Sequence, residues 1–386
     1  MSVARGTIEP GAGGHPRRRI AVAALYAGGF LGPFGGAVTS SVLPEIGGDF
    51  RVSAGVAAGS LTAYLLPFAA LMVVSGALGA RWGARRTVLV AYVVYALASV
   101  LCVVAWTFPV LLAGRALQGA ANSFTTPLLL ATIAAVTPAE RLGRSLGLFA
   151  SMQAAGQTTA PLVGGLAAEV SWRWAFAGAA VVAVGLAVGG LPADPPREQR
   201  PGLRSAWTWR TLRLAGTGMV VWGCLGGLSY LVALRLGDDF GLTSGERGLL
   251  LTGFGVAGIA TARLTGWFVD HVGPRRSARV GAVVGAVVVA LVGVLPNLVA
   301  VGVLWAAAGA LSQAVVVGLN AIALRGDTPG GSVSVVQALR FLGAAVSPLA
   351  FVPLYHLDAT AAFLAPAVAT AVTAAVLLTR RGLPTG

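Results

Sequence analysis

The chain has 386 residues, of which 56% are hydrophobic and only 10% are charged. Its mean hydropathy is +0.81, and a soluble protein of this length could not keep so much apolar surface out of water. The net charge of +14 would indicate nucleic-acid binding in a soluble chain. These features exclude a soluble fold, and we expect an all-α membrane protein that binds the lipid bilayer and no nucleic acid.

Apolar runs of about 20 residues, the length of a membrane-spanning helix, follow one another along the chain. The first run comes directly after three arginines, but it is too long for a secretory signal and has no clear cleavage site, so we expect it to be retained. In chain order, the twelve predicted spans are 20–43, 53–78, 88–106, 109–134, 145–168, 173–192, 213–235, 247–269, 277–295, 298–323, 333–355 and 359–379.

The longest polar stretch lies near the middle of the chain and separates six predicted spans from the next six. It contains proline and several charges but no apolar run. We therefore predict twelve transmembrane helices in two pseudo-symmetric six-helix bundles. The predicted parts are a tail at 1–19, a first bundle at 20–192, a linker at 193–212, a second bundle at 213–379 and a tail at 380–386.

The arginines are distributed unevenly between the two sides of the membrane. With the N-terminus in the cytoplasm, 20 arginines fall in inner segments and only four in outer ones, at Arg51, Arg173, Arg235 and Arg247. Because basic residues favour the cytoplasmic side, both termini and the linker are predicted to be cytoplasmic. All 27 basic residues are arginine, which indicates a GC-rich bacterial genome and hence the inner membrane of a bacterium.

One loop sequence occurs twice, at an offset of 190 residues. The first copy follows the second span and reads GALGARWGARR at 76–86, and the second follows the eighth span and reads GWFVDHVGPRR at 266–276. The second copy contains an acid, Asp270, where the first contains Ala80. Duplicated bundles are a common build of secondary transporters, whose substrate binds between the halves near the bilayer midplane.

In the repeated loop at 76–86 and 266–276 the chain resembles the major facilitator superfamily, whose loop after the second span reads roughly G-x-L-A-D-R-x-G-R-R. The fourth span contains Arg115-Ala-Leu-Gln118-Gly119, similar to the family's R-x-x-Q-G. The fifth span contains GQTTAPLVGG at 156–165, which is similar to the G-x-x-x-G-P-x-x-G-G element of the drug/proton antiporter branch, with Ala160 replacing one glycine. The resemblance covers essentially the whole chain and implies a twelve-span transporter of a small molecule. We expect it to need no cofactor and to act as a monomer.

The resemblance also implies which residues control the conformation. The arginine-rich turns would latch neighbouring helices at the cytoplasmic face, and the glycines and proline of the fifth span would form a hinge. Membrane orientation and ordinary helix packing are the alternative roles. The conformational candidates are Gly76, Arg81, Gly83, Arg85, Arg86, Gly156, Pro161, Gly164, Gly165, Asp270, Gly273 and Arg275.

Polar side chains recur at helical spacing inside several spans, where they are costly unless they face a cavity or a partner. In the fourth span, for example, three of them lie along one helical face at positions i, i+3 and i+7. Interhelical hydrogen bonding that only holds the bundle together is the alternative. The predicted substrate-binding residues are Arg115, Gln118, Asn122, Gln153, Gln157, Trp222, Tyr230, Gln313, Asn320, Gln337 and Arg340.

None of the 13 carboxylates lies in the middle third of a predicted span. The nearest candidates for proton coupling are Glu45, near the outer end of the first span, and Asp270, in an inner loop. The predicted cavity therefore contains Arg115 and Arg340 without an acidic partner, which favours anionic or neutral substrates over cations. No spacing of histidine, cysteine and acidic residues indicates a metal site.

The sequence therefore predicts a secondary active transporter that exports a small hydrophobic or anionic organic compound by alternating access, coupled to protons. Uptake or exchange of a metabolite, and uniport, are alternatives within transport. A transport-dead sensor is less favoured because the polar stripes are intact. A membrane enzyme is less favoured because no GxSxG or HExxH motif is present, and no GxxxxGK[ST] motif indicates an ATP-driven pump.

Overall fold

The computed structural model describes residues 16–192, 208–324 and 329–377, and every regular element within these ranges is helical. This all-helical architecture agrees with the predicted fold class. The predicted tails at 1–19 and 380–386 and the linker at 193–212 lie wholly or mostly outside the described residues. Their boundaries, and those of the two predicted bundles, stay predictions.

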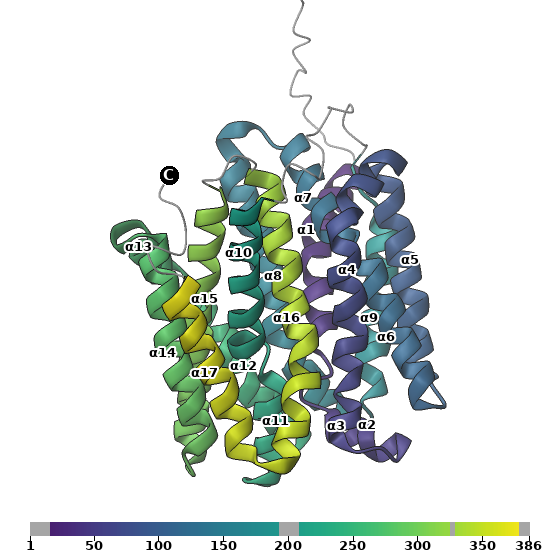
Figure 1. Ribbon diagram of the computed structural model, residues 1–386. Helices are drawn as coiled ribbons and strands as arrows, with labels where there is room; N and C mark the ends of the chain where they lie inside the picture. Colours follow the sequence, from purple (N-terminus) through teal and green to yellow (C-terminus); the bar gives the residue numbers. More distant parts are fainter. Residues whose placement is uncertain (1–15, 193–207, 325–328, 378–386) are drawn as a thin grey trace, which may run out of the picture.

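The helices before the predicted linker form what we call the first set (Figure 1). They are α1 (Pro16–Ala37), α2 (Leu43–Phe50), α3 (Ala54–Ala57), α4 (Gly59–Trp82), α5 (Ala84–Val103), α6 (Phe108–Asn122), α7 (Thr125–Val136), α8 (Ala139–Ala168) and α9 (Arg173–Gly189). The short helix α2 was not predicted, and Pro44 stands in its first turn, where a missing backbone N–H costs nothing.

The second set follows the linker and contains one π-helical turn. Its elements are α10 (Trp209–Val221), η2 (Trp222–Gly226), α11 (Ser229–Asp238), α12 (Ser244–Ala260), α13 (Ala262–Val272), α14 (Pro274–Val294), α15 (Leu298–Leu324), α16 (Pro329–Leu357) and α17 (Ala359–Leu377). The turn η2 interrupts the seventh predicted span between α10 and α11.

Helices occupy all twelve predicted spans, but several spans are divided. In the described part of the chain, eight helical segments are long and apolar enough to cross a membrane, or nine if the pair α12 and α13, bent by 50°, counts as one span. The bend follows Thr261, whose hydroxyl donates back to the Ala257 carbonyl oxygen at 2.7 Å and so competes with the helical hydrogen bond. The full count of twelve spans stays a prediction.

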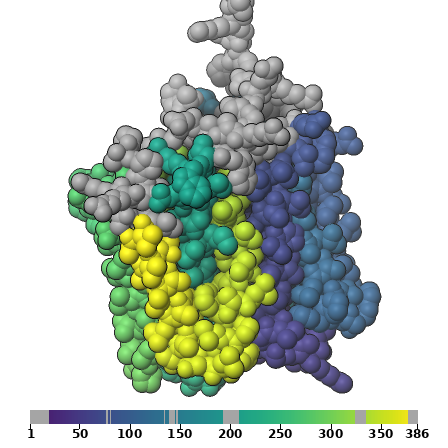
Figure 2. Space-filling view, in the orientation of Figure 1, coloured from purple at the N-terminus to yellow at the C-terminus, as the bar shows by residue number. Residues whose placement is uncertain are grey.

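The packing of helices in the first set is repeated in the second. In the first set α1 packs on α8, α4 on α6, and α5 on α9. The corresponding pairs of the second set are α10 with α16, α12 with α15, and α14 with α17. The sets meet through α8 against α12 and α4 against α16, and Figure 2 shows the second of these seams, with α16 in yellow-green beside α4 in purple. An internal two-fold similarity therefore extends from the loop sequence to the helix contacts.

The repeated loop has the same backbone turn in both copies. Gly83 has φ +92° and Gly273 has φ +91°, a region that residues with a Cβ rarely adopt. Each glycine accepts a hydrogen bond at its carbonyl from the backbone N–H four residues later, at Thr87 and Ser277. The glycine of the repeated motif is thus explained by the tight connection between consecutive long helices.

The outside of the bundle is apolar over much of its length. Large hydrophobic side chains are exposed on several helices, among them Leu97, Val181, Val299 and Val372 at 55–73% of their surface. Exposure of this extent would be a liability in water but is the normal condition of a helix that faces lipid. Polar side chains such as Arg115 and Gln118 are buried inside instead, as expected for a membrane bundle.

Candidate functional site

Arg115 of α6 is fully buried where three helices of the first set meet. Its Nε donates to the Ser60 carbonyl oxygen of α4 at 3.2 Å, and one terminal nitrogen donates to the Gly35 carbonyl oxygen of α1 at 2.7 Å. The other terminal nitrogen donates to Oε1 of Gln118 at 2.9 Å. The guanidinium carbon lies 4.5 Å from the centre of the Tyr64 ring. Within the described part of the chain, carbonyl dipoles and an aromatic face, and no carboxylate, therefore stabilise this charge.

The other two members of the predicted polar stripe on α6 are also fully buried. Nε2 of Gln118 donates to the Ser99 hydroxyl of α5 at 2.7 Å, and Oδ1 of Asn122 accepts from the Thr125 hydroxyl at 2.8 Å. Only Nδ2 of Asn122 is without a partner. The geometry gives this stripe a role in holding α6 against its neighbours, and direct contact of these residues with substrate stays a prediction.

The internal repeat gives Arg115 an aromatic counterpart. At the offset of 190 residues its equivalent is Trp305 of α15, whose indole N–H donates to the Leu251 carbonyl oxygen of α12 at 3.3 Å. Both side chains therefore donate to the backbone of the helix that lies in the second predicted span of their own set, α4 for Arg115 and α12 for Trp305. The close helix contact one turn later is also repeated, because a Cβ on Gly119 would meet the Tyr64 carbonyl oxygen and a Cβ on Gly309 that of Phe254, each at 1.9 Å.

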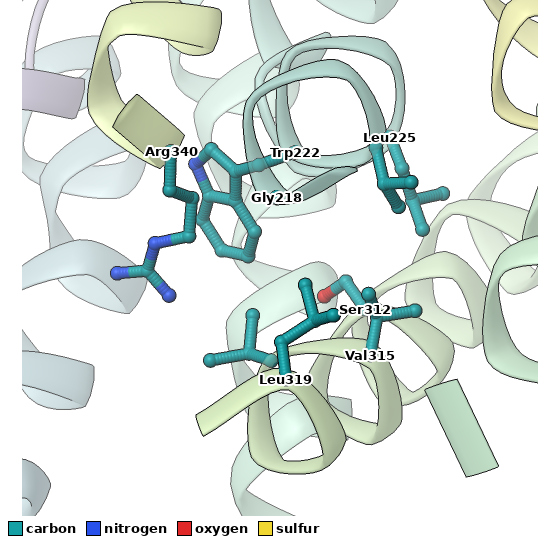
Figure 3. A pocket seen from close by; sticks show the side chains of 9 residues that line it. Gly218, Trp222, Leu225, Ser312, Val315, Leu319 and Arg340 are labelled. Atoms are coloured by element: carbon teal, nitrogen blue, oxygen red, sulfur yellow. The ribbon is translucent and has the colours of Figure 1, made fainter. Parts of the chain in front are cut away.

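Arg340 of α16 has a different environment. Its guanidinium carbon lies 4.4 Å from the centre of the Trp222 ring and 4.8 Å from that of Phe341. Its Nε is buried and has no hydrogen-bond partner among the residues that the structure describes. Figure 3 shows the side chain alongside the indole of Trp222, beside a small cavity of about 10 Å³ that is also lined by Ser312 and Leu319, roughly the volume of one water molecule.

The remaining predicted substrate-binding residues lie on both sets of helices. Tyr230 of α11 is buried, with its hydroxyl 2.9 Å from that of Ser347, and Ser347 donates to the Gly223 carbonyl oxygen of η2 at 2.8 Å. Oε1 of Gln337, one turn before Arg340, is buried and has no partner in the part of the chain that the structure describes. The partly buried members of the predicted group are Gln153, Gln157, Gln313, Asn320, Gln337 and Arg340.

One end of the bundle, where α2, α3 and α11 lie, contains polar contacts between the two sets of helices; we call it the α2/α11 end (bottom of Figure 1). Glu45 of α2 forms an ion pair with Arg247 of α12, whose side chain is only 4% exposed. The second carboxylate oxygen of Glu45 and Nε of Arg247 are buried and have no hydrogen-bond partner within the described ranges. The predicted coupling residue Glu45 therefore joins the two sets directly.

A second carboxylate at the same end, Glu169, was not predicted from the sequence. It follows α8 and accepts hydrogen bonds from the Gly245 backbone N–H at 2.8 Å and the Ser244 hydroxyl at 3.2 Å. It thus satisfies a free N–H of the first turn of α12. These hydrogen bonds, with that from Gly245 first, lower the pKa of the Glu169 carboxyl. No signal in the sequence relates the two segments, because they are 76 residues apart.

The predicted hinge of the fifth span lies in α8, between α1 and α12. A Cβ on Gly156 would meet the Phe30 carbonyl oxygen at 2.2 Å, and one on Gly164 that of Val38 at 2.3 Å. A Cβ on Gly165 would meet the Ser244 carbonyl oxygen of α12 at 2.2 Å. These glycines permit close contact both within the first set and across the seam. Whether Pro161, which lies between them, acts as a hinge stays a prediction.

The conformational candidates of the repeated loops lie at the opposite end of the bundle. Gly76 belongs to α4, Asp270 is an exposed residue of α13, and Arg81, Arg85 and Arg86 are also exposed. Arg275 is partly buried at the start of α14. No group of three or more histidine, cysteine or acidic residues within the described ranges could hold a metal ion. The latch function of these loops stays a prediction.

Comparison with protein families gives a match to the Major Facilitator Superfamily over residues 25–234. EfpA of Mycobacterium tuberculosis, described as an uncharacterised MFS-type transporter, is 30% identical over 250 residues, which are 64% of this chain and 44% of EfpA. The puromycin resistance protein pur8 of Streptomyces alboniger is 32% identical over 223 residues, 57% of this chain and 42% of pur8. The chain thus spans less than half the length of these curated relatives.

The fold is similar to that of solved transporters. A bacterial homologue of the human lysosomal transporter Spinster, in an inward-facing and occupied conformation, has a TM-score of 0.77 at 18% identity, covering 94% of this chain and 96% of that one. The human organic anion transporter MFSD10 has a TM-score of 0.70 at 19% identity, covering 95% of this chain and all 100% of that one. At these identities the likeness concerns the fold alone.

Proposed function

Because the chain belongs to the major facilitator superfamily, it is a membrane transporter and not an enzyme, and we propose that it exports a small hydrophobic or anionic organic compound in exchange for protons. The direction of transport rests on the relatives named for resistance. These include pur8 and a multidrug resistance protein B homologue of Mycobacterium tuberculosis, 31% identical over 129 residues, which are 33% of this chain and 24% of the homologue.

The observation that carries the proposal is the ion pair between Glu45 and Arg247. Alternating access needs contacts between the two halves that form in one state and break in the other. This pair joins α2 of the first set to α12 of the second, and protonation of Glu45 would remove one of its two charges. The arginine distribution predicts that the α2/α11 end faces the outside, so external protons would weaken its closure.

The charge of the bundle interior supports the choice of substrate. Arg115 and Arg340 lie inside the bundle, and in the described ranges no carboxylate pairs with either. Attraction between charges is strong where water is scarce, so this interior favours anionic or neutral compounds over cations. Glu45 is the better placed of the two proton-coupling candidates, because Asp270 is exposed near the opposite end.

Exchange or uniport is the second candidate function. It is favoured by the positions of the carboxylates that the structure describes, which lie at helix ends or in connections and not at mid-span. A protonatable acid in the path of the substrate would be the simpler means of coupling. In an exchanger, Glu45 would then serve only to close the α2/α11 end.

Flux measurements separate the two functions. We propose growth of an overexpressing strain on a panel of toxic compounds, followed by transport of the best protected compound in proteoliposomes. Export driven by an imposed pH gradient, and abolished by a protonophore, would support proton-coupled efflux. Flux that depends on the substrate gradient alone would support the second function, and absence of flux for every protected compound would contradict both.

A further inference from the structure

We propose that the transported compound carries an anionic group, such as a carboxylate, which binds to the guanidinium of Arg340 beside the indole of Trp222. This inference rests on the proposed function, because it names the substrate class and the residue of this chain that receives its charge.

The first observation is that Arg340 lacks polar partners. Three other arginines, Arg115, Arg235 and Arg247, are buried, and each donates to a carboxylate, an amide oxygen or a carbonyl oxygen. Within the described ranges the guanidinium of Arg340 has only the rings of Trp222 and Phe341. A cation inside a membrane protein is costly unless it is paired, and cation–π contact compensates only part of that cost.

The second observation is the position of this arginine along the bundle. Arg340 is twelfth among the 29 residues of α16, so by helical rise it lies about 16 Å from the start of that helix. Trp222 opens the π-helical turn η2, which breaks the continuous apolar segment Trp209–Asp238 near its middle. Transporter sites form near the midplane at discontinuous helices, and π-helical turns are frequent at functional sites.

The third observation connects this site to the seam between the two sets. Phe341, the neighbour of Arg340, packs edge-on against Phe68 of α4 with ring centres 5.0 Å apart. Six residues earlier in α4, the hydroxyl of Thr62 donates to the Ala345 carbonyl oxygen of α16 at 2.7 Å. Arg340 therefore lies beside the surface along which the two sets must separate. An anion bound there would contact residues that change their neighbours during transport.

The chemistry of the site selects the ligand. A guanidinium offers a planar pair of N–H donors that matches a carboxylate or a sulfonate, and it binds such groups in bidentate geometry. The indole of Trp222 and the side chains of Val315 and Leu319 form an apolar wall beside it. The matching ligand is an aromatic or aliphatic monoanion. The cavity of about 10 Å³ is too small for an organic monoanion of this kind, so binding requires the helices to move apart.

Binding measurements on the purified full-length protein test this inference. We propose calorimetric titration with 1-naphthoate and with 1-naphthamide, which has the same aromatic body without the charge. The wild type should bind 1-naphthoate about tenfold more tightly, as expected for one charge-assisted contact. Arg340→Gln should bind both compounds equally, and the exposed control Arg263→Gln should behave as the wild type.

Three results would overturn the inference: no measurable binding of 1-naphthoate, equal binding of the two compounds by the wild type, or an unchanged preference in Arg340→Gln. If Arg340→Gln does not fold, Arg340→Lys provides the test. Lysine keeps the positive charge but lacks the planar pair of N–H donors, so this variant should prefer 1-naphthoate over 1-naphthamide more weakly than the wild type does. A preference as strong as that of the wild type would contradict bidentate binding.

Two further experiments distinguish substrate binding at Arg340 from lipid binding there and from the proposed function itself. An anionic lipid headgroup could bind Arg340 through the same charge, so the titration is repeated with phosphatidylglycerol. If phosphatidylglycerol occupies the site and 1-naphthoate does not displace it, the assignment of the site to substrate is wrong. Flux is then measured in proteoliposomes. Binding that depends on Arg340 without any flux would contradict the proposed function alone, whereas flux of compounds without a preference for anions would contradict the inference alone.

Discussion

At the scale of single residues, Arg115 shows how a cation is accommodated inside the bundle with no carboxylate among its partners in the described residues. Its donors reach the Ser60 and Gly35 carbonyl oxygens and the amide oxygen of Gln118. Each acceptor carries a partial negative charge, and their number compensates for the absence of an ionic partner. The side chain thereby links α6 to α4 and α1.

Replacing Arg115 by lysine should destabilise the protein. A single ammonium group cannot reach acceptors on three helices, so at least one buried carbonyl oxygen would lose its donor, at a cost of about 2 kcal/mol. Thermal unfolding in detergent should therefore give a clearly lower melting temperature. Arg263→Lys, at an exposed position of α13, is the matched control and should leave it unchanged. Equal stability of the two variants would contradict a structural role for Arg115.

The same residue shows what the sequence could and could not predict. The spacing of Arg115, Gln118 and Asn122 correctly indicates one helical face, but a cavity and a neighbouring helix satisfy buried polar groups equally well. The sequence alone therefore cannot decide whether this face lines a cavity or packs against a neighbouring helix. Glu169 was missed for another reason, since a carboxylate at a helix end has many ordinary roles and its partners lie far away in the chain.

At the scale of helices, the α2/α11 end is closed by contacts that can break one at a time. Replacing Glu45 by glutamine should weaken this closure, because the ion pair with Arg247 would become a neutral contact while the packing of α8 on α12 remains. Spin labels on α3 and α16, measured by pulsed EPR, should show a larger open population. Removal of a partly buried ion pair of this kind is worth about 1 kcal/mol, which changes the ratio of states about fivefold.

A matched control for this prediction lies on the same helix. Asp49 of α2 pairs with Arg173 of α9, within the first set, so Asp49→Asn removes an ion pair without touching the seam. The open population should then stay that of the wild type. An equal shift in Asp49→Asn and Glu45→Gln would mean that the position of α2, and not the contact across the seam, controls this end.

Glu169 gives the same end a dependence on pH. The hydrogen bonds from Gly245 and Ser244 lower its pKa in the closed contact, so the deprotonated form favours closure. Their contribution is present above the ordinary pKa of a free carboxyl and is lost as the pH falls through the lowered value. The open population of the spin-labelled protein should therefore rise as the pH falls below about 4. Glu169→Gln should reduce this rise, and an identical pH profile would contradict the assignment.

At the scale of the whole molecule, the repeat explains the fold better than hydropathy alone does. The loop repeat predicted two related halves, and the helix contacts follow it from α1 on α8 to α14 on α17. Hydropathy predicted unbroken spans, but the turn η2 interrupts the seventh and a bend after Thr261 interrupts the eighth. Such breaks depend on local backbone hydrogen bonds that a window of average hydropathy does not register.

The helix α9 decides whether the two halves have the same orientation in the membrane. Its 17 residues extend about 26 Å, slightly less than the hydrocarbon thickness of about 30 Å. Flanking aromatic and basic residues and local thinning can accommodate that mismatch. Trp174, exposed over 64% of its surface, and Arg173 stand at its start and suit a membrane interface. We therefore expect α9 to cross the bilayer.

Reporter fusions test this crossing. Alkaline phosphatase, active only outside the inner membrane, should be active when fused after Ser171 and inactive when fused after Ser205 in the predicted linker. A green fluorescent protein, which fluoresces only when it folds in the cytoplasm, should show the reverse pattern. If α9 stayed on one side, both positions would give the same signal, and the second set would be inverted relative to the first. Its arginine-rich loop at 266–276 would then face the outside, against the distribution of basic residues in the rest of the chain.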